Sequence, residues 1–267
     1  MKQDFQFKQK YNVDDLVEIM CILRSEDGCP WDREQTHESI RKNFIEETYE
    51  AIEAINKADS HLLCEELGDV LMQVVFHAQM EAEKQVFDFF DVADGVCKKL
   101  IERHPHVFGD VEVQSADDVL VNWDKIKSAS KQRKTTADKM QSVPRELPAL
   151  MRADKIQSQA AKVGFDWDTP DGALQKIPEE TEELLQAVKA GDRENTFEEL
   201  GDLLFAVVNT ARKLHIDPEE ALTAATDKFQ SRFTKVEHLA QARGVDMSAS
   251  TLETLDRLWD EVKSTES

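Results

Sequence analysis

Two sets of four carboxylates, repeated with the same spacing, are the residues of this chain best suited to chemistry. In each set a Glu-x-x-Glu pair is followed, sixteen residues after its second glutamate, by a Glu-x-x-Asp pair. The two sets are Glu47, Glu50, Glu66 and Asp69, and Glu180, Glu183, Glu199 and Asp202. Residues three apart lie on one face of an α-helix, so each pair presents its carboxylates in one direction.

The spacing predicts that a helical hairpin assembles each set. In an antiparallel helix pair, residues equidistant from the turn lie side by side, and the first set is centred on Ala58. Residues 57–60 there combine a turn with a helix N-cap. The second set is centred on Gly191. The carboxylates of each set are expected roughly 12 to 16 Å from the turn, at about 1.5 Å per residue.

Carboxylates gathered in this way repel one another and require a cation. Asp69 and Asp202 each precede an apolar run, where an unpaired charge is costly. A hard divalent cation with oxygen ligands meets both demands, and Mg²⁺ is favoured over Ca²⁺ or Mn²⁺. The alternative is a solvated acidic face, which the identical spacing of the two sets disfavours.

The elements that position these residues are all predicted to be helical. Glycine and proline are scarce, at 9 and 7 residues, and no long alternating pattern typical of strands is present. A loop is predicted at residues 25–32, and Pro178 is expected in the first turn of a helix. Helices are predicted at residues 13–24, 36–56, 61–84, 88–104, 115–133, 147–162, 172–190, 194–214, 217–243 and 250–264.

The two halves of the chain are predicted to be an internal duplication. The four tryptophans pair off at 136 residues, Trp31 with Trp167 and Trp123 with Trp259. The carboxylate sets recur at 133 residues, which small insertions explain. We therefore predict an all-α fold with two tandem helical-bundle modules, residues 1–130 and 147–267, joined by a linker at residues 131–146.

Composition excludes several classes of function. The net charge is −21, with 54 acidic and 33 basic residues, and this disfavours a nucleic-acid-binding surface. No run of about 18 apolar residues is present, so no membrane span is expected. The 4 cysteines form no Cys-x-x-Cys pair and are interpreted as reduced thiols, which favours a cytoplasmic protein.

Basic and aromatic residues also recur between the halves. Lys228 and Arg232 lie four apart, as do Lys99 and Arg103, so each pair either binds phosphate oxygens or balances surface charge. The tryptophans leave similar alternatives open. Trp123 and Trp259 either stack on a base or fill a core, and Trp31 and Trp167 either line the mouth of a pocket or pack structurally.

Taken in order, these motifs resemble the MazG-type all-α nucleoside triphosphate pyrophosphohydrolases. Three further stretches carry the resemblance: Gly-Cys-Pro-Trp-Asp at residues 28–32, Arg-His-Pro-His-Val-Phe at residues 103–108 and Gly-Phe-Asp-Trp-Asp at residues 164–168. The similarity covers about residues 13–264. It implies Mg²⁺-dependent cleavage of an NTP into NMP and diphosphate, with Mn²⁺ as a possible substitute. It also implies a homodimer whose helices pack across the subunit interface, and catalysis mainly by the C-terminal module.

The resemblance also implies roles for particular residues. The implied metal ligands are Glu180, Glu183, Glu199 and Asp202, with Glu47, Glu50, Glu66 and Asp69 as their counterparts in the first half. The implied nucleotide contacts are Lys176, Glu179, Glu180, Asn195, Glu198, Asp202, Lys228, Arg232 and Trp259. A spare carboxylate, Glu46 or Glu179, is expected to help activate the attacking water.

Three other functions are compatible with parts of this pattern. A di-iron or di-manganese bundle oxidase uses Glu-x-x-His, whereas the second motif here ends in aspartate. A non-enzymatic helical interaction protein would use the acidic face to dock a partner. A nucleotidase of narrow specificity, for dUTP or modified NTPs, would share the chemistry and differ in base preference.

Overall fold

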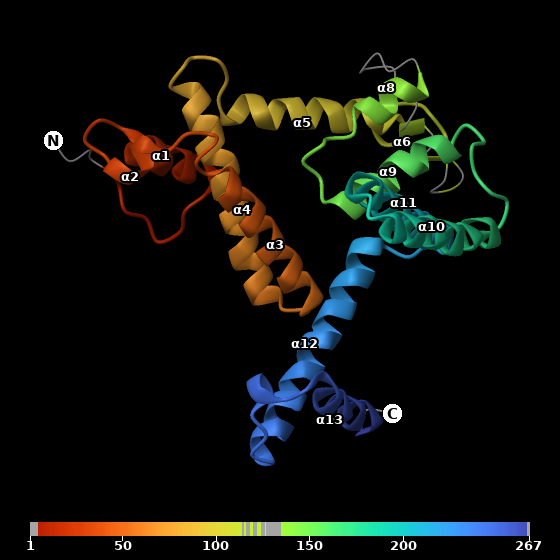
Figure 1. Cartoon of the computed structure of the whole chain (residues 1–267). Helices are drawn as coiled ribbons and strands as arrows, with labels where there is room; N and C mark the ends of the chain where they lie inside the picture. Colours follow the sequence, from red (N-terminus) through yellow and green to blue (C-terminus); the bar gives the residue numbers. More distant parts are fainter. Residues whose placement is uncertain are drawn as a thin grey trace. The chain divides into compact units, whose positions relative to one another are not determined.

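The chain folds as two compact units of helices, Met1–Lys127 and Ser128–Ser267. The computed structural model describes residues 5–113, 115, 118–119, 122–123, 126 and 135–265. Within these ranges every regular element is a helix, so the prediction of an all-α fold is confirmed (Figure 1). None of the helices described is long and apolar enough to cross a membrane.

The first unit is built around a hairpin of two long helices. Its helices are α1 (Val13–Arg24), α2 (Pro30–Glu34), α3 (Arg41–Asn56), α4 (Ser60–Ala82), α5 (Phe89–Arg103) and α6 (Pro105–Phe108). α3 and α4 pack against each other along the hairpin, and α1 and α5 contact α4 (Figure 1). The buried core joins α1 and α4 to the start of α3 through Met20, Ile40, Val75, Phe76 and Met80.

The second unit repeats the hairpin and adds a long helical arm. Its helices are α8 (Thr136–Gln141), α9 (Ala149–Ala161), α10 (Pro170–Ala190), α11 (Arg193–Lys213), α12 (Pro218–Ala242), η1 (Met247–Ala249) and α13 (Leu252–Thr265). α10 and α11 form the hairpin, and α9 packs on α11. α12 contacts α9 and α11, and α13 packs on α12 through Val236, Ala240, Leu258 and Val262.

Both hairpins turn at the residues on which the carboxylate sets are centred. Ala58 has φ of 53° and Gly191 has φ of 69°, so both lie in the left-handed region that ends a helix. The next residue in each case, Asp59 or Asp192, caps the following helix by accepting hydrogen bonds from backbone N–H groups. The spacing of the carboxylates thus predicted both turns.

Several boundaries differ from the predictions. Pro30 starts α2 inside the stretch predicted as a loop, because proline is well accommodated at the first position of a helix. α3 begins at Arg41 instead of residue 36, since Thr36 and Ser39 bond each other's backbone N–H groups in a turn. The predicted linker contains α8, which begins with a capping box between Thr135 and Asp138.

The expectation for Pro178 was wrong. It lies inside α10, and Pro170 occupies the first turn of that helix instead. An interior proline has no N–H to donate to the carbonyl four residues earlier, so packing of α10 on α11 must offset this cost. The helix predicted at residues 115–133 and the tryptophan motif at residues 122–128 lie largely outside the described residues.

Candidate metal and nucleotide site

Each hairpin brings three of its four predicted carboxylates into one cluster. One ligand oxygen from each member lies within 4.8 Å of the others. The clusters are Glu47, Glu66 and Asp69 in the first unit, and Glu180, Glu199 and Asp202 in the second. In each cluster one residue comes from the first helix of the hairpin and two come from the second.

The fourth members, Glu50 and Glu183, lie outside these clusters but within electrostatic reach of them. Burial is the main cause that raises the pKa of Glu66 and of Glu199 above 4.5, and the charges of Glu50 and Glu183 are the next largest causes. Burial also raises the pKa of Glu47, with Asp69 as the strongest charged contributor. A site that disfavours carboxylate charge is relieved by a cation.

The donor set fits a hard divalent cation. Both clusters offer only carboxylate oxygens, which suit Mg²⁺, Mn²⁺ and Ca²⁺ and are less suited to softer metals. A di-iron or di-manganese bundle site would include histidine ligands, whereas the two clusters found among the described residues consist of glutamate and aspartate. The acidic clusters therefore have the chemistry of a divalent metal site in both units.

A lysine distinguishes the second cluster from the first. Lys176 on α10 donates to Glu179 at 2.7 Å and lies 2.9 Å from Glu180, and these two hydrogen bonds raise the pKa of the lysine. Glu180 is buried, so it gains a charged partner where water is scarce. The position matching Lys176 in the first unit is Asn43. Only the second cluster therefore carries an ammonium group at this position.

A cavity of about 270 Å³ opens beside the second cluster. Two members of the cluster, Glu180 and Asp202, line it together with Lys176. Most of its remaining wall is apolar or aromatic and comes from α9, α10, α11 and the loop between α9 and α10. Its other lining residues are Ile156, Gln157, Ala160, Phe165, Trp167, Ala173, Phe205, Ala206, Asn209 and Arg212.

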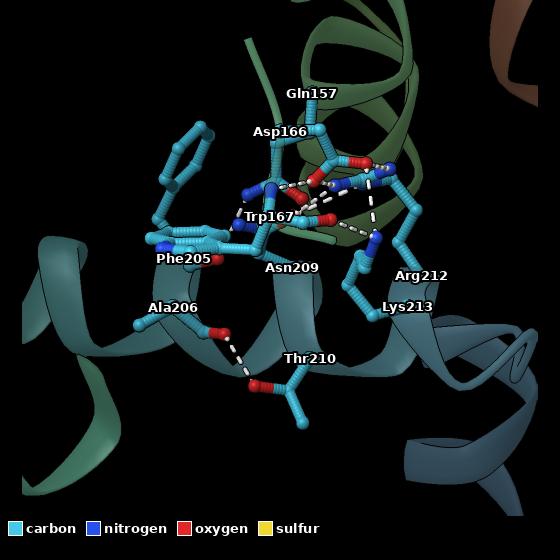
Figure 2. A network of polar contacts seen from close by, with 9 residues as sticks. All are labelled: Gln157, Asp166, Trp167, Phe205, Ala206, Asn209, Thr210, Arg212 and Lys213. Atoms are coloured by element: carbon cyan, nitrogen blue, oxygen red, sulfur yellow. Dashed lines mark hydrogen bonds and ion pairs between the residues drawn. The ribbon is translucent and has the colours of Figure 1, made fainter. Parts of the chain in front are cut away.

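An ion-pair network anchors the loop that forms one wall of this cavity (Figure 2). Asp166 accepts from Arg212 Nη1 at 3.0 Å and from Nη2 at 2.6 Å, and from Lys213 at 3.2 Å. Lys213 also donates to the carbonyl of Trp167 at 2.5 Å. The hydrogen bonds from Arg212 are the main reason that the pKa of Asp166 falls to about 2.

The same loop places the Trp167 indole against α10. A Cβ atom added at Gly172 would lie 2.2 Å from Cδ1 of Trp167, so the missing side chain makes room for the ring. Trp167 is 41% exposed, whereas its counterpart Trp31 in the first unit is 60% exposed. Two interpretations were left open for Trp167, a residue at the mouth of a pocket or a residue that packs structurally. Its position in the wall of the cavity agrees with the first interpretation.

The predicted nucleotide-contact residues do not all lie near this cavity. Asn195 and Glu198 occupy the first turns of α11, where Asp192 accepts a hydrogen bond from the Asn195 backbone. Lys228 and Arg232 lie on α12, and Trp259 lies on α13 beside Phe229, with ring centroids 5.1 Å apart. Lys228, Arg232 and Trp259 do not line the cavity of their own chain.

Sequence reasoning missed three of the polar residues that line the cavity. Gln157, Asn209 and Arg212 come from two helices and follow no motif, so neither spacing nor charge pattern singles them out. The one available signal was Asp166, which lies in the stretch that carries the resemblance and is anchored by Arg212.

Comparisons with known proteins point to one family. The profile of the MazG nucleotide pyrophosphohydrolase domain matches residues 35–108 and 168–237, one segment in each unit. A nucleoside triphosphate pyrophosphohydrolase of Escherichia coli (strain K12) is 45% identical over 257 residues, covering 95% of this chain and 98% of the relative.

Two further relatives are similar over nearly the whole chain. The nucleoside triphosphate pyrophosphohydrolase/pyrophosphatase MazG of Thermotoga maritima is 46% identical over 250 residues, 94% of this chain and 95% of the relative. An uncharacterized protein of Bacillus subtilis, YabN, is 47% identical over 249 residues, which are 93% of this chain and 51% of that longer protein.

Proposed function

Because this chain belongs to the MazG family of nucleotide pyrophosphohydrolases, we propose that it hydrolyses nucleoside triphosphates to nucleoside monophosphates and diphosphate. The observation that carries the proposal is the cluster of Glu180, Glu199 and Asp202 at the edge of a cavity. A metal site beside an aromatic-lined cavity offers one place for a triphosphate and another for a nucleoside.

The carboxylates of the second unit are proposed to hold the metal. Glu180, Glu199 and Asp202 supply the clustered oxygens, and Glu183, whose charge raises the pKa of Glu199, is proposed to complete the set. When bound there, Mg²⁺ neutralises the charge of a triphosphate and lowers the pKa of a coordinated water. The chain contains no Gly-x-x-x-x-Gly-Lys-Ser/Thr loop, so its phosphate recognition differs from that of P-loop enzymes.

The remaining charged residues act on the phosphates and on the attacking water. Glu179 is half-exposed and paired with Lys176, and it is the proposed acceptor of the proton from a water that attacks the α-phosphorus. Lys176 faces the same carboxylates and is proposed to bind a phosphate oxygen. Lys228 and Arg232 are proposed to stabilise the diphosphate leaving group.

A second copy of the chain is proposed to bring these distant cations to the site. α11 exposes an apolar stripe with the spacing of one helix face: Phe197 at 81%, Leu200 at 47%, Leu204 at 50% and Val207 at 44%. Such a stripe is typical of a surface that another helix covers. In the proposed homodimer the two copies meet through this stripe, and the partner supplies its α12 and α13 to the site. We expect a Leu200→Glu/Leu204→Glu variant to sediment as a monomer.

The function is tested by product analysis. Each common NTP is incubated with the protein and Mg²⁺, and NMP, NDP, diphosphate and phosphate are separated by chromatography at early times. The proposal expects NMP and diphosphate in equal amounts, because attack at the α-phosphorus releases both together. NDP and phosphate as first products would contradict it. A Glu199→Gln/Asp202→Asn variant controls for contaminating phosphatases.

A further inference from the structure

Two amide side chains line the cavity beside the second carboxylate cluster, and we propose that this cavity binds the nucleobase of the substrate. Gln157 of α9 and Asn209 of α11 then contact the hydrogen-bonding edge of the base. This inference rests on the proposed hydrolysis of nucleoside triphosphates and assigns the part of the molecule that recognises the base.

Gln157 presents a buried acceptor that lacks a partner. Its side-chain nitrogen donates to the carbonyl of Phe205 at 2.8 Å, which fixes the orientation of the amide (Figure 2). Gln157 is only 6% exposed, and its Oε1 has no hydrogen-bond partner among the described residues. A buried acceptor left unpaired is costly, so a ligand that donates an N–H to it gains binding energy.

Asn209 offers the complementary group. Its Oδ1 accepts from Arg212 Nε at 3.0 Å and from Nη2 at 2.7 Å (Figure 2). These two bonds occupy the oxygen, so the amide nitrogen is the group that Asn209 has to offer a ligand. Arg212 is held in turn by Asp166, so the amide is positioned by a chain of charge-assisted hydrogen bonds.

An acceptor and a donor in one cavity suit the edge of a nucleobase. Adenine, cytosine, guanine and uracil each carry an N–H donor next to a ring nitrogen or carbonyl acceptor. Trp167 and Phe165 of the loop and Phe205 of α11 supply flat apolar surface in the same cavity. Because Glu180 and Asp202 also line it, a base placed against the amides leaves its phosphates on the side of the metal ligands.

The first unit lacks this arrangement at the matching position. Counting from the carboxylates, Asn209 corresponds to Phe76, which is 4% exposed. Phe76 packs in the core with Met20 and Met80, and the guanidinium carbon of Arg24 lies 5.3 Å from the centre of its ring. An aromatic core residue thus takes the place of the amide. The proposed base pocket is therefore specific to the second repeat.

The pocket also extends beyond the part of the chain that the family profile matches. The second matched segment is residues 168–237, whereas Gln157, Phe165 and Trp167 precede it. Gln157 of α9 and the loop residues Phe165 and Trp167 therefore lie outside the matched segment that holds the metal ligands. Such an arrangement separates the choice of base from the chemistry at the phosphates.

Two variants test the proposal. Asn209→Phe introduces the residue of the first repeat and fills the pocket, and Gln157→Leu removes the buried acceptor while keeping a similar volume. Gln73→Leu is the matched control, since Gln73 is a buried glutamine of the first unit whose Oε1 also has no partner in the described residues. Circular dichroism and melting temperature establish that each variant folds.

The substrates separate recognition of the base from recognition of the phosphates. kcat/KM is measured for ATP and for purine riboside triphosphate, which lacks the exocyclic amino group, and inhibition is measured with inorganic tripolyphosphate. Asn209→Phe is expected to lower kcat/KM for ATP roughly tenfold or more through KM, with unchanged inhibition by tripolyphosphate. Gln157→Leu is expected to reduce the preference for ATP over purine riboside triphosphate by about tenfold, and Gln73→Leu to leave it unchanged.

The outcomes distinguish the pocket from the activity. If the wild type hydrolyses ATP but both variants keep its kcat/KM and its preference, the base pocket is wrong while the proposed function stands. Loss of inhibition by tripolyphosphate in the variants would also overturn the pocket, because the substitutions would then impair binding of the phosphates as well as binding of the base.

If the wild type hydrolyses no NTP, the proposed function fails. Calorimetric binding of AMP to the wild type and to Asn209→Phe then decides on the pocket, with weaker binding by the variant supporting it and equal binding overturning it. If Asn209→Phe does not fold, Gln157→Leu decides alone.

Discussion

Asp166 and Arg212 form a two-pronged ion pair across the second unit, with oxygen-to-nitrogen distances of 3.0 and 2.6 Å. The two residues are 46 positions apart, and their pairing ties the loop before α10 to the end of α11. The side chain of Asp166 is only 19% exposed and that of Arg212 only 14%, so water screens this pair less than it screens a surface pair. This ion pair therefore holds the Trp167 wall of the cavity in place.

Substitution of Asp166 tests this role. Asp166→Asn keeps the shape of the side chain but weakens the charge-assisted bonds, and we expect a loss of about 1–2 kcal/mol in the free energy of unfolding. The KM for NTP should also rise several-fold as the loop loosens. Urea denaturation and steady-state kinetics measure the two effects. Arg257→Gln is the control, because the side chains of Arg257 and its partner Glu253 are 76% and 78% exposed and such a surface pair contributes little.

The stability that the Asp166–Arg212 pair contributes should decrease at acidic pH. The folded pKa of Asp166 is about 2, below the ordinary value of 3.8, so the folded state favours the charged form. The stabilisation is complete above pH 3.8 and is lost as the pH falls towards 2. Acid titration of stability should therefore be steeper in this range for the wild type than for Asp166→Asn. Parallel curves would mean that the pair is not formed in solution.

In the absence of metal, the carboxylate clusters should make stability depend on pH in the opposite direction from the Asp166–Arg212 pair. Burial and neighbouring charges raise the folded pKa of Glu199 above 4.5, so the folded state binds more protons than the unfolded chain. Stability of the metal-free protein should then fall as the pH rises from 4.5 through the raised pKa. Glu199→Gln should flatten this decline. The measurement is the melting temperature in EDTA between pH 4 and 7.

Binding of Mg²⁺ should reverse the destabilisation. A ligand that binds only the folded state adds about 2.7 kcal/mol when its concentration is 100 times the dissociation constant. We therefore expect Mg²⁺ to raise the melting temperature of the wild type. Glu199→Gln/Asp202→Asn should reduce the gain, leaving the part due to the first unit. A double mutant with the full response to Mg²⁺ would indicate a solvated acidic face instead of a metal site.

The hairpins were predictable because they depend on local periodicity. The turns at Ala58 and Gly191 follow from the equal spacing of carboxylates on either side, and helix geometry converts that spacing into contact. Pro178 shows the limit of local rules, since packing of α10 on α11 keeps a proline inside a helix. Local propensity predicted a helix start there, and tertiary contacts overrode it.

The cavity was beyond prediction for a different reason. Gln157 and Asn209 are 52 positions apart and lie on helices whose relative placement no sequence pattern specifies. Glutamine and asparagine are common on helix surfaces, so neither attracts notice before the structure shows one of them buried with an unpaired oxygen. Trp167 was predicted as a possible pocket residue because it lies in a loop just before the helix that carries the acidic motif.

The structural differences between the two repeats predict which of them carries out turnover. The second has Lys176 beside its carboxylates and an open cavity, whereas the first has Asn43 and an aromatic core at the corresponding places. We expect Glu183→Ala to lower kcat by about 100-fold or more, because the metal site of the active repeat loses a carboxylate. We expect Glu50→Ala to leave a substantial fraction of turnover.

The test is the kcat of each single variant at saturating Mg²⁺ and NTP, after circular dichroism confirms that both variants fold. Glu50 and Glu183 are the fairest pair to compare, because they occupy matching positions and both lie outside the three-carboxylate clusters. Halving of kcat by either substitution would show two equivalent sites. Loss of activity only in Glu50→Ala would assign turnover to the first repeat, and the lysine and cavity of the second would then need a role other than catalysis.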